Sequence, residues 1–149
     1  IGFVDNAKLI NEYQEKIEVQ KKLQEKIKLY ELKRDSVRQS FQLEINEAEL
    51  KSRSMSQAEL QKLSQELQQK DQIINQRDQF DQQQIAQESQ RQNDSLIKKV
   101  RSFVENYGLN HGYDYILGSN EAGSVMYGKK SNDLTQTILD ALNEKYAKQ

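Results

Sequence analysis

The chain contains 149 residues, of which 35% are hydrophobic and 30% are charged, and its formal net charge is −1. The low hydrophobic fraction excludes a single thick core, because ordinary globular domains contain roughly 45–50% apolar residues. The near-neutral charge argues against a nucleic-acid-binding protein, which would carry a concentrated basic patch. Cysteine is absent, which excludes disulfides and thiolate metal sites. No segment approaches the ~20 apolar residues of a membrane span, so we expect no stable membrane insertion.

The distribution of glycine and proline predicts the domain organisation. Proline is absent, and every glycine other than Gly2 lies at or after Gly108. Disordered chains are usually rich in proline, whereas long helices exclude it because it lacks a backbone donor. We therefore expect a helical block at residues 7–107, and a head domain formed by residues 1–6 and 108–149.

The sequence begins with a predicted strand and a long helix. Residues 2–5 form the strand, with Phe3 as its bulky side chain, and Asn6 is expected to cap the helix that follows. Apolar residues then recur at an average spacing close to ~3.5 residues, the period of a coiled coil. This pattern predicts one continuous helix from residue 7 to about residue 53.

A second helix is predicted after a break at residues 54–56. Glu59 follows Ser56 by three positions, the spacing of a capping box, in which each side chain binds the other residue's backbone amide. The apolar pattern continues to Tyr107, and Gly108 is expected to end the helix.

The apolar residues of the two helices match as an antiparallel pair. Facing residues in such a pair have position numbers that add up to a nearly constant value, and two unrelated helices would not satisfy this condition. We therefore predict a long antiparallel helical hairpin, or tentacle, with its tip near residues 54–56. The predicted pairs are Leu50 with Leu60, Ala48 with Leu63, Ile45 with Leu67, Val37 with Ile74, Tyr30 with Phe80, Ile27 with Ile85, Tyr13 with Val100, and Leu9 with Phe103.

The C-terminal block alternates glycines with short runs of aromatic and β-branched residues. It predicts a strand at residues 113–117, a turn at 118–123, a third strand at 124–127, and a final helix capped by Asp133. Three strands and one helix are too small to bury themselves, so we expect the head to oligomerise. The fold class is thus mainly α with a small β head, and the hairpin is inserted between the head strands. The expected interface residues are Phe3, Tyr113, Tyr115, Ile116, Val125 and Met126.

This order of elements resembles the Skp/OmpH family of periplasmic chaperones. The resemblance lies in the two ends of the chain, whereas the hairpin matches by pattern. The residues that carry it are Gly2-Phe3-Val4-Asp5, Leu9-Ile10, Gly112-Tyr113-Asp114-Tyr115-Ile116-Leu117, Val125-Met126-Tyr127, Asp133-Leu134-Thr135, Ile138, Leu142 and Asn143.

The resemblance implies a homotrimer whose three tentacles enclose a cavity. It also implies ATP-independent binding of unfolded outer-membrane proteins in the periplasm. The chain opens abruptly at Ile1, so we expect that a signal peptide has been removed. One feature departs from the family pattern: its best-known members are strongly basic, whereas this chain has a pI of about 6.0.

The sequence offers little for catalysis. His111 is the only histidine and lies in a predicted turn, where a single histidine is usually solvated. Carboxylates on long amphipathic helices usually form a solvated face paired with lysines. We therefore expect no enzymatic activity, no metal site and no cofactor.

A second set of apolar residues lies off the predicted seam of the hairpin. It comprises Val19, Leu29, Leu32 and Leu43, with Ile73 and Ile97 as similar cases. These residues are either scattered surface hydrophobes or a weak contact stripe for clients.

The alternative function is a structural coiled-coil spacer or adaptor of the cell envelope. A prefoldin-like chaperone fits less well, because its strands lie between its helices.

Overall fold

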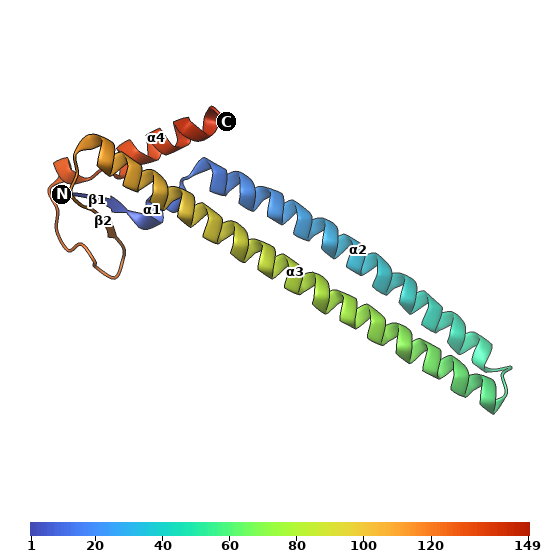
Figure 1. Cartoon of the computed structure of the whole chain (residues 1–149). Coiled ribbons are helices and arrows are strands. Elements are labelled where there is room, and N and C mark those ends of the chain that lie inside the picture. Colours follow the sequence, from blue (N-terminus) through green and yellow to red (C-terminus); the bar gives the residue numbers. More distant parts are fainter. The chain divides into compact units, whose positions relative to one another are not determined.

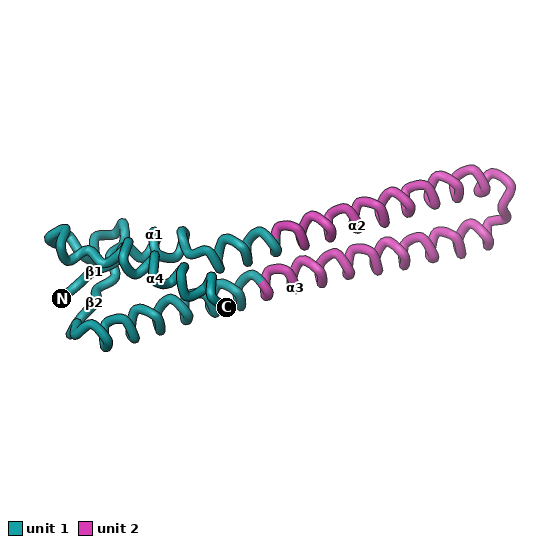
Figure 2. Tube along the Cα trace, turned by 90° about the horizontal axis from the view of Figure 1, so that it is seen from above, with its two compact units in different colours: residues 1–23, 89–149 teal, residues 24–88 magenta.

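The computed structural model describes residues 1–149, which are mostly helical (Figure 1). The chain divides into two compact units, unit 1 (Ile1–Leu23 and Ser89–Gln149) and unit 2 (Gln24–Glu88), which Figure 2 colours separately. The elements are, in chain order, β1 (Gly2–Asp5), α1 (Asn6–Asn11), α2 (Gln14–Ser52), α3 (Gln57–His111), β2 (Ile116–Ser119), the 3-10 turn η1 (Lys130–Asn132) and α4 (Thr135–Ala147).

Unit 2 consists of segments of α2 and α3 that lie side by side and run in opposite directions (Figure 1). Hydrogen bonds join the two helices: the Tyr30 hydroxyl donates to the backbone oxygen of Asp78 at 3.2 Å, and Arg38 donates to the Asn75 side chain at 3.2 Å. Ion pairs between Lys26 and Glu88, between Lys70 and Glu44, and between Arg38 and Asp78 add to these links.

The turn of unit 2 begins and ends as the capping pattern predicts. Helix α2 ends at Ser52 and α3 begins at Gln57. The Ser56 N–H donates to the Glu59 carboxylate at 2.8 Å, and the Glu59 N–H donates to the Ser56 hydroxyl at 3.3 Å. The capping box predicted from the sequence is therefore confirmed.

Two of the predicted apolar pairs of unit 2 are brought to the same place, although their contact stays a prediction. Ile45 and Leu67 line one shallow hollow, and Val37 and Ile74 line another. Phe80, which was predicted to face Tyr30, is instead 58% exposed. The reason is that polar residues occupy the seam at this level: Asp78 is held there by Arg38 and accepts from the Tyr30 hydroxyl at its backbone oxygen. The expected contact of Ile27 with Ile85 stays a prediction.

The continuous first helix predicted from the sequence is wrong, because the chain breaks between Asn11 and Gln14. Helix α1 is capped by Asp5 rather than by Asn6: the Asp5 carboxylate accepts from the Lys8 N–H at 3.0 Å. The break is stabilised by Asn143 of α4, whose side chain binds the backbone on both sides of it. No local sequence signal marks this break, since its partner lies at the other end of the chain.

Helix α3 continues past Gly108, where the sequence predicted its end, and stops at His111. Gly112 follows with a φ of 72°, the left-handed conformation that glycine adopts easily. The Tyr113 N–H then donates to the Gly108 carbonyl at 3.0 Å, the long hydrogen bond of a Schellman cap. The glycine that ends the helix is therefore Gly112.

The sheet has two parallel strands instead of the three predicted. Strand β1 pairs with β2 in the register Gly2 with Ile116 to Asp5 with Ser119, so the second strand lies later than the expected 113–117. The other edge of β1 is already used, since the Leu134 N–H donates to the Phe3 carbonyl at 2.9 Å. Residues 124–127 therefore cannot add to β1 at that edge, and they form no strand with β2 either, so the predicted third strand is wrong.

The core of unit 1 forms where β1, α1, α3 and α4 meet. Leu9 and Ile138 are its least exposed side chains, at 1% and 0%. The expected cap of α4 by Asp133 is wrong: the N-cap is Leu134, and Asp133 accepts instead from the N–H and the hydroxyl of Thr135. The buried residues of this core are Val4, Leu9, Tyr13, Leu96, Val100, Leu134, Ile138, Leu139 and Leu142.

Candidate functional site

The apolar residues expected to form a contact stripe fall into two groups. Val19 is half-buried and packs against the core of unit 1. The others are exposed, with exposed fractions of 68% for Leu29, 59% for Leu32, 63% for Leu43, 63% for Ile73 and 41% for Ile97.

Unit 2 exposes further large apolar side chains that the sequence reasoning placed in the seam. Leu50 is 66% exposed and Phe80 is 58% exposed. Both fit the coiled-coil period only approximately, so spacing alone did not separate them from buried positions. Their spacing from other exposed residues is a clearer signal: Leu50 lies seven residues after Leu43, and Phe80 lies seven after Ile73. Seven residues is one full repeat of a coiled coil, so each pair shares a face.

His111 serves the structure of the α3 terminus. Its ring stacks on Tyr107, with 3.9 Å between ring centroids, and its Nδ1 lies 2.8 Å from the Tyr107 carbonyl oxygen. No group of three or more histidine, cysteine, aspartate or glutamate side chains is placed to hold a metal ion. None of the helices combines the length and the apolar character that spanning a membrane would require.

A polar network links α2, α3 and α4 within unit 1. The Tyr13 hydroxyl donates to Glu15, which also pairs with Lys99, and the Tyr146 hydroxyl donates to Glu18 at 2.7 Å. Burial raises the pKa of Glu15, but the hydrogen bonds from Lys99 and Tyr13 outweigh it and hold this pKa below its ordinary value. Burial and the bond to Glu15 together raise the pKa of Tyr13. These bonds fasten the first turns of α2.

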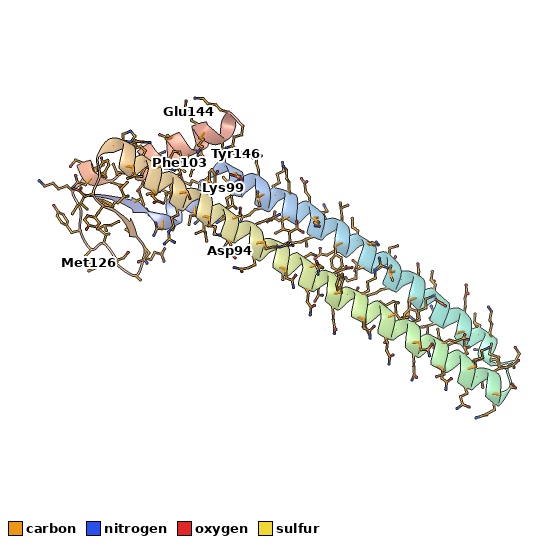
Figure 3. The ribbon with its side chains drawn as sticks, in the orientation of Figure 1. Asp94, Lys99, Phe103, Met126, Glu144 and Tyr146 are labelled. Atoms are coloured by element: carbon orange, nitrogen blue, oxygen red, sulfur yellow. The ribbon has the colours of Figure 1, made fainter.

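Figure 3 shows Lys99 and Phe103 on α3 close to Tyr146 on α4. The Lys145 ammonium lies over the Phe103 ring, 5.6 Å from its centroid. The rings of Tyr146 and Tyr13 meet edge to face, with 6.1 Å between centroids. Every member of this cluster has a structural partner, so the cluster fastens α4 onto α3 and offers no free reactive group.

The comparison with known families decides which class of protein this is. The sequence model of the family described as "Outer membrane protein (OmpH-like)" matches residues 1–142. The chain belongs to the OmpH-like family. This membership confirms the resemblance seen in the sequence, and the family is not an enzyme family.

A solved structure shares the fold of this OmpH-like chain. It is the crystal structure of an OmpH-like candidate outer membrane chaperone from Caulobacter crescentus CB15, with a TM-score of 0.85 and 14% sequence identity. The match covers 97% of this chain and 83% of that one. At this identity the likeness shows the fold alone. No curated protein matches the sequence.

The residues expected at the assembly surface of the OmpH-like chain lie in unit 1. Tyr115 is 64% exposed and Met126 is 90% exposed, and Tyr127 beside it is 83% exposed. Figure 3 shows Met126 in the loop that follows β2. The remaining expected residues, Phe3, Tyr113, Ile116 and Val125, are half-buried.

A hollow of about 720 Å³ opens on the same unit. It lies between β1, β2, α1 and α3, and Tyr113 and Ile116 form part of its wall together with the core residues Val4, Leu9 and Val100. The expected interface residues are therefore divided between an exposed loop and the wall of an open, partly apolar hollow.

Proposed function

We propose that this chain is an ATP-independent holding chaperone of the periplasm, which binds unfolded outer-membrane proteins. The observation that carries the proposal is the set of large apolar side chains left exposed along the helices of unit 2 in a member of the OmpH-like family. Soluble monomers rarely leave apolar side chains grouped on one surface unless that surface binds something.

Holding by such a surface needs no nucleotide. Partial burial of each aliphatic side chain is worth about 1 kcal/mol, and several contacts act together because binding one raises the effective concentration of the rest. An unfolded membrane protein carries apolar segments that supply the matching surface. Release follows when the client folds and withdraws those segments.

The test is an aggregation assay without nucleotide. A urea-unfolded outer-membrane β-barrel protein is diluted into buffer with and without the chain, and light scattering is recorded. The proposal expects scattering to be suppressed at near-stoichiometric amounts of chain. If several such clients aggregate at an unchanged rate, the alternative of a structural spacer or adaptor in the envelope takes its place.

We further propose that the head residues assemble three chains, with three hairpins enclosing the client cavity. The support for assembly is that residues 124–127 lack a strand partner within the chain, while Tyr115, Met126 and Tyr127 are exposed. Exposed apolar groups and unpaired backbone favour association between copies. Multi-angle light scattering at micromolar concentration tests this: a trimer mass is expected, and a stable monomer would contradict it.

A further inference from the structure

The helix pair of unit 2 has two faces, and we propose that clients bind one of them. The binding face, which we call the basic-apolar face, carries Leu29, Lys33, Ile73, Arg77 and Phe80. This inference rests on the proposed holding function and adds to it the side of the helix pair that the client contacts.

The first step places these residues on one side. Lys33 on α2 and both Ile73 and Arg77 on α3 line the same hollow between the helices. Residues three or four apart are neighbours on a helix surface, so Leu29 lies beside Lys33 and Phe80 beside Arg77.

The row of exposed apolar residues on α2 continues beyond Leu29. Leu43 and Leu50 follow Leu29 at two and three full heptads, and residues a whole number of heptads apart keep the same side of a paired helix. All five apolar side chains of this face are more than half exposed.

The opposite side of unit 2 is polar. Arg38 spans the two helices there through its bonds to Asn75 and Asp78. In the coiled-coil period the outward positions beside this bridge are charged or carry glutamine: Lys28, Asp35, Gln42 and Glu49 on α2, and Gln65, Gln72 and Gln79 on α3. No large apolar side chain falls at these positions, so the two faces differ in chemistry.

The spacing of the apolar residues favours an irregular client over another helix. A helix that packs against a coiled coil needs two apolar positions in every heptad. Here each helix offers at most one per heptad, with polar residues such as Ser36 between them. A flexible unfolded chain adapts to such separated contacts.

Charge adds to the choice of client. Lys33 and Arg77 lie across from each other, and neither forms an ion pair within the chain. The same hollow is also lined by Arg34, Asp78 and Asp81. Arg34 pairs with Asp35 and Asp78 pairs with Arg38, so two unpaired cations stand against one unpaired carboxylate. The remaining positive charge suits an unfolded segment that has acidic residues next to its apolar ones.

The absence of cysteine makes a direct test available. Ser36→Cys places one thiol on the basic-apolar face, in the same row as Leu29 and Leu43. Gln79→Cys places one on the opposite face at a similar height along the helix pair. Each variant is labelled with a maleimide photocrosslinker and mixed with a urea-unfolded outer-membrane β-barrel protein. We expect client crosslinks from the Ser36→Cys variant and few from the Gln79→Cys variant.

A second test uses affinity. The triple variant Leu29→Ser, Ile73→Ser and Phe80→Ser should weaken client binding by about tenfold or more, since every 1.4 kcal/mol is a factor of ten. The matched control is the triple variant Gln65→Ser, Gln72→Ser and Gln79→Ser, which changes three exposed side chains of the opposite face. Circular dichroism shows whether helix content is kept.

The outcomes separate the two proposals. If the unaltered protein holds no client, the holding function falls and the face assignment falls with it. If it holds clients but crosslinks them equally from both faces, or more from the Gln79→Cys variant, the face assignment alone is overturned. Crosslinks between two copies of the Ser36→Cys variant without client would also overturn it, since a second copy would then cover the face.

Discussion

The carboxamide of Asn143 in α4 binds the backbone of Gln14, where α2 begins: its Oδ1 accepts from the Gln14 N–H at 2.9 Å. The Nδ2 of the same side chain donates to the Glu12 carbonyl at 3.3 Å. A helix break leaves backbone donors and acceptors without intrahelical partners. One side chain thus supplies both partners, and it comes from the last helix of the chain.

Replacing Asn143 by alanine should therefore destabilise unit 1 by about 1 kcal/mol, the net value of a typical hydrogen bond. Water reaches this site, so the loss stays modest. Thermal unfolding measures the change, and hydrogen exchange at the Gln14 amide should become faster. Glu144→Ala is the control, because Glu144 pairs only with Lys148 on an exposed surface. Equal effects of the two substitutions would contradict a special role for Asn143.

Gly2 should not tolerate a side chain. An added Cβ would meet the Leu134 side chain, with 3.1 Å to its Cγ, and Leu134 is only 6% exposed. Overpacking of a filled core typically costs about 1–3 kcal/mol, so Gly2→Ala should lower the unfolding temperature. Gly112→Asn serves as the comparison: nothing lies near a Cβ there, and asparagine accepts the left-handed conformation better than most residues. A larger loss at Gly112 than at Gly2 would contradict this account.

The sequence predicted the parts of the fold that depend on local chemistry. The absence of glycine and proline predicted two long helices, and the Ser56–Glu59 spacing predicted where the second begins. It could not predict features that depend on distant partners. The break before Gln14 needs Asn143, and the edge of β1 that a third strand could have used is taken by Leu134.

The sequence predicted only part of the candidate site, because the exposure of some of its residues also depends on distant partners. Leu29, Leu32 and Leu43 lie off the seam and are exposed, as their spacing indicated. Val19 has the same spacing but packs against the core of unit 1, whose residues are distant in the sequence, so no pattern local to Val19 indicates its burial. Aspartates are unusual at buried positions, so the sequence reasoning assigned Phe80 to the seam, where aspartates lie instead.

Val19 and Leu32 should therefore respond differently to the same substitution. Val19→Ser removes apolar contacts from the core of unit 1 and should cost about 1 kcal/mol of stability. Leu32→Ser removes a side chain that is 59% exposed and should change stability by less than about 0.5 kcal/mol, as surface substitutions usually do. Urea unfolding of the two variants measures both values. If Val19→Ser leaves the free energy of unfolding unchanged, the packing of Val19 against the core does not stabilise the fold.

Acid should destabilise unit 1 through Glu15 and Asp133. The folded pKa of Glu15 lies below its ordinary value of 4.5, and hydrogen bonds from Thr135 hold the pKa of Asp133 below its ordinary value of 3.8. A lowered folded pKa means that the unfolded chain binds protons more tightly. The stability from these groups is complete above their ordinary pKa values and is lost as the pH falls through the folded ones.

The Glu15→Gln variant checks the acid effect. It should be less stable than the unaltered chain at neutral pH, and its stability should fall less between about pH 5 and the acid unfolding midpoint. Glu25→Gln, which changes an exposed glutamate of unit 2, is the matched control. If the pH profiles of the Glu15→Gln variant and the unaltered chain run parallel, the bonds from Lys99 and Tyr13 do not contribute to the acid sensitivity.

Client holding, if apolar contacts carry it, should persist in moderate salt. Exposed charges are screened over a Debye length of about 10 Å at 0.1 M salt, whereas apolar contacts do not weaken under these conditions. The chain has a net charge of only −1, so attraction by overall charge has little to contribute. We expect suppression of client aggregation at about 0.3 M salt to stay close to its low-salt level.

The Leu29→Ser, Leu32→Ser and Leu43→Ser variant should weaken holding at both salt concentrations without loss of helix. Val19 is kept in that variant because it supports the core. Loss of holding in salt, together with full holding by the serine variant, would show that charges such as Lys33 and Arg77 carry the binding instead.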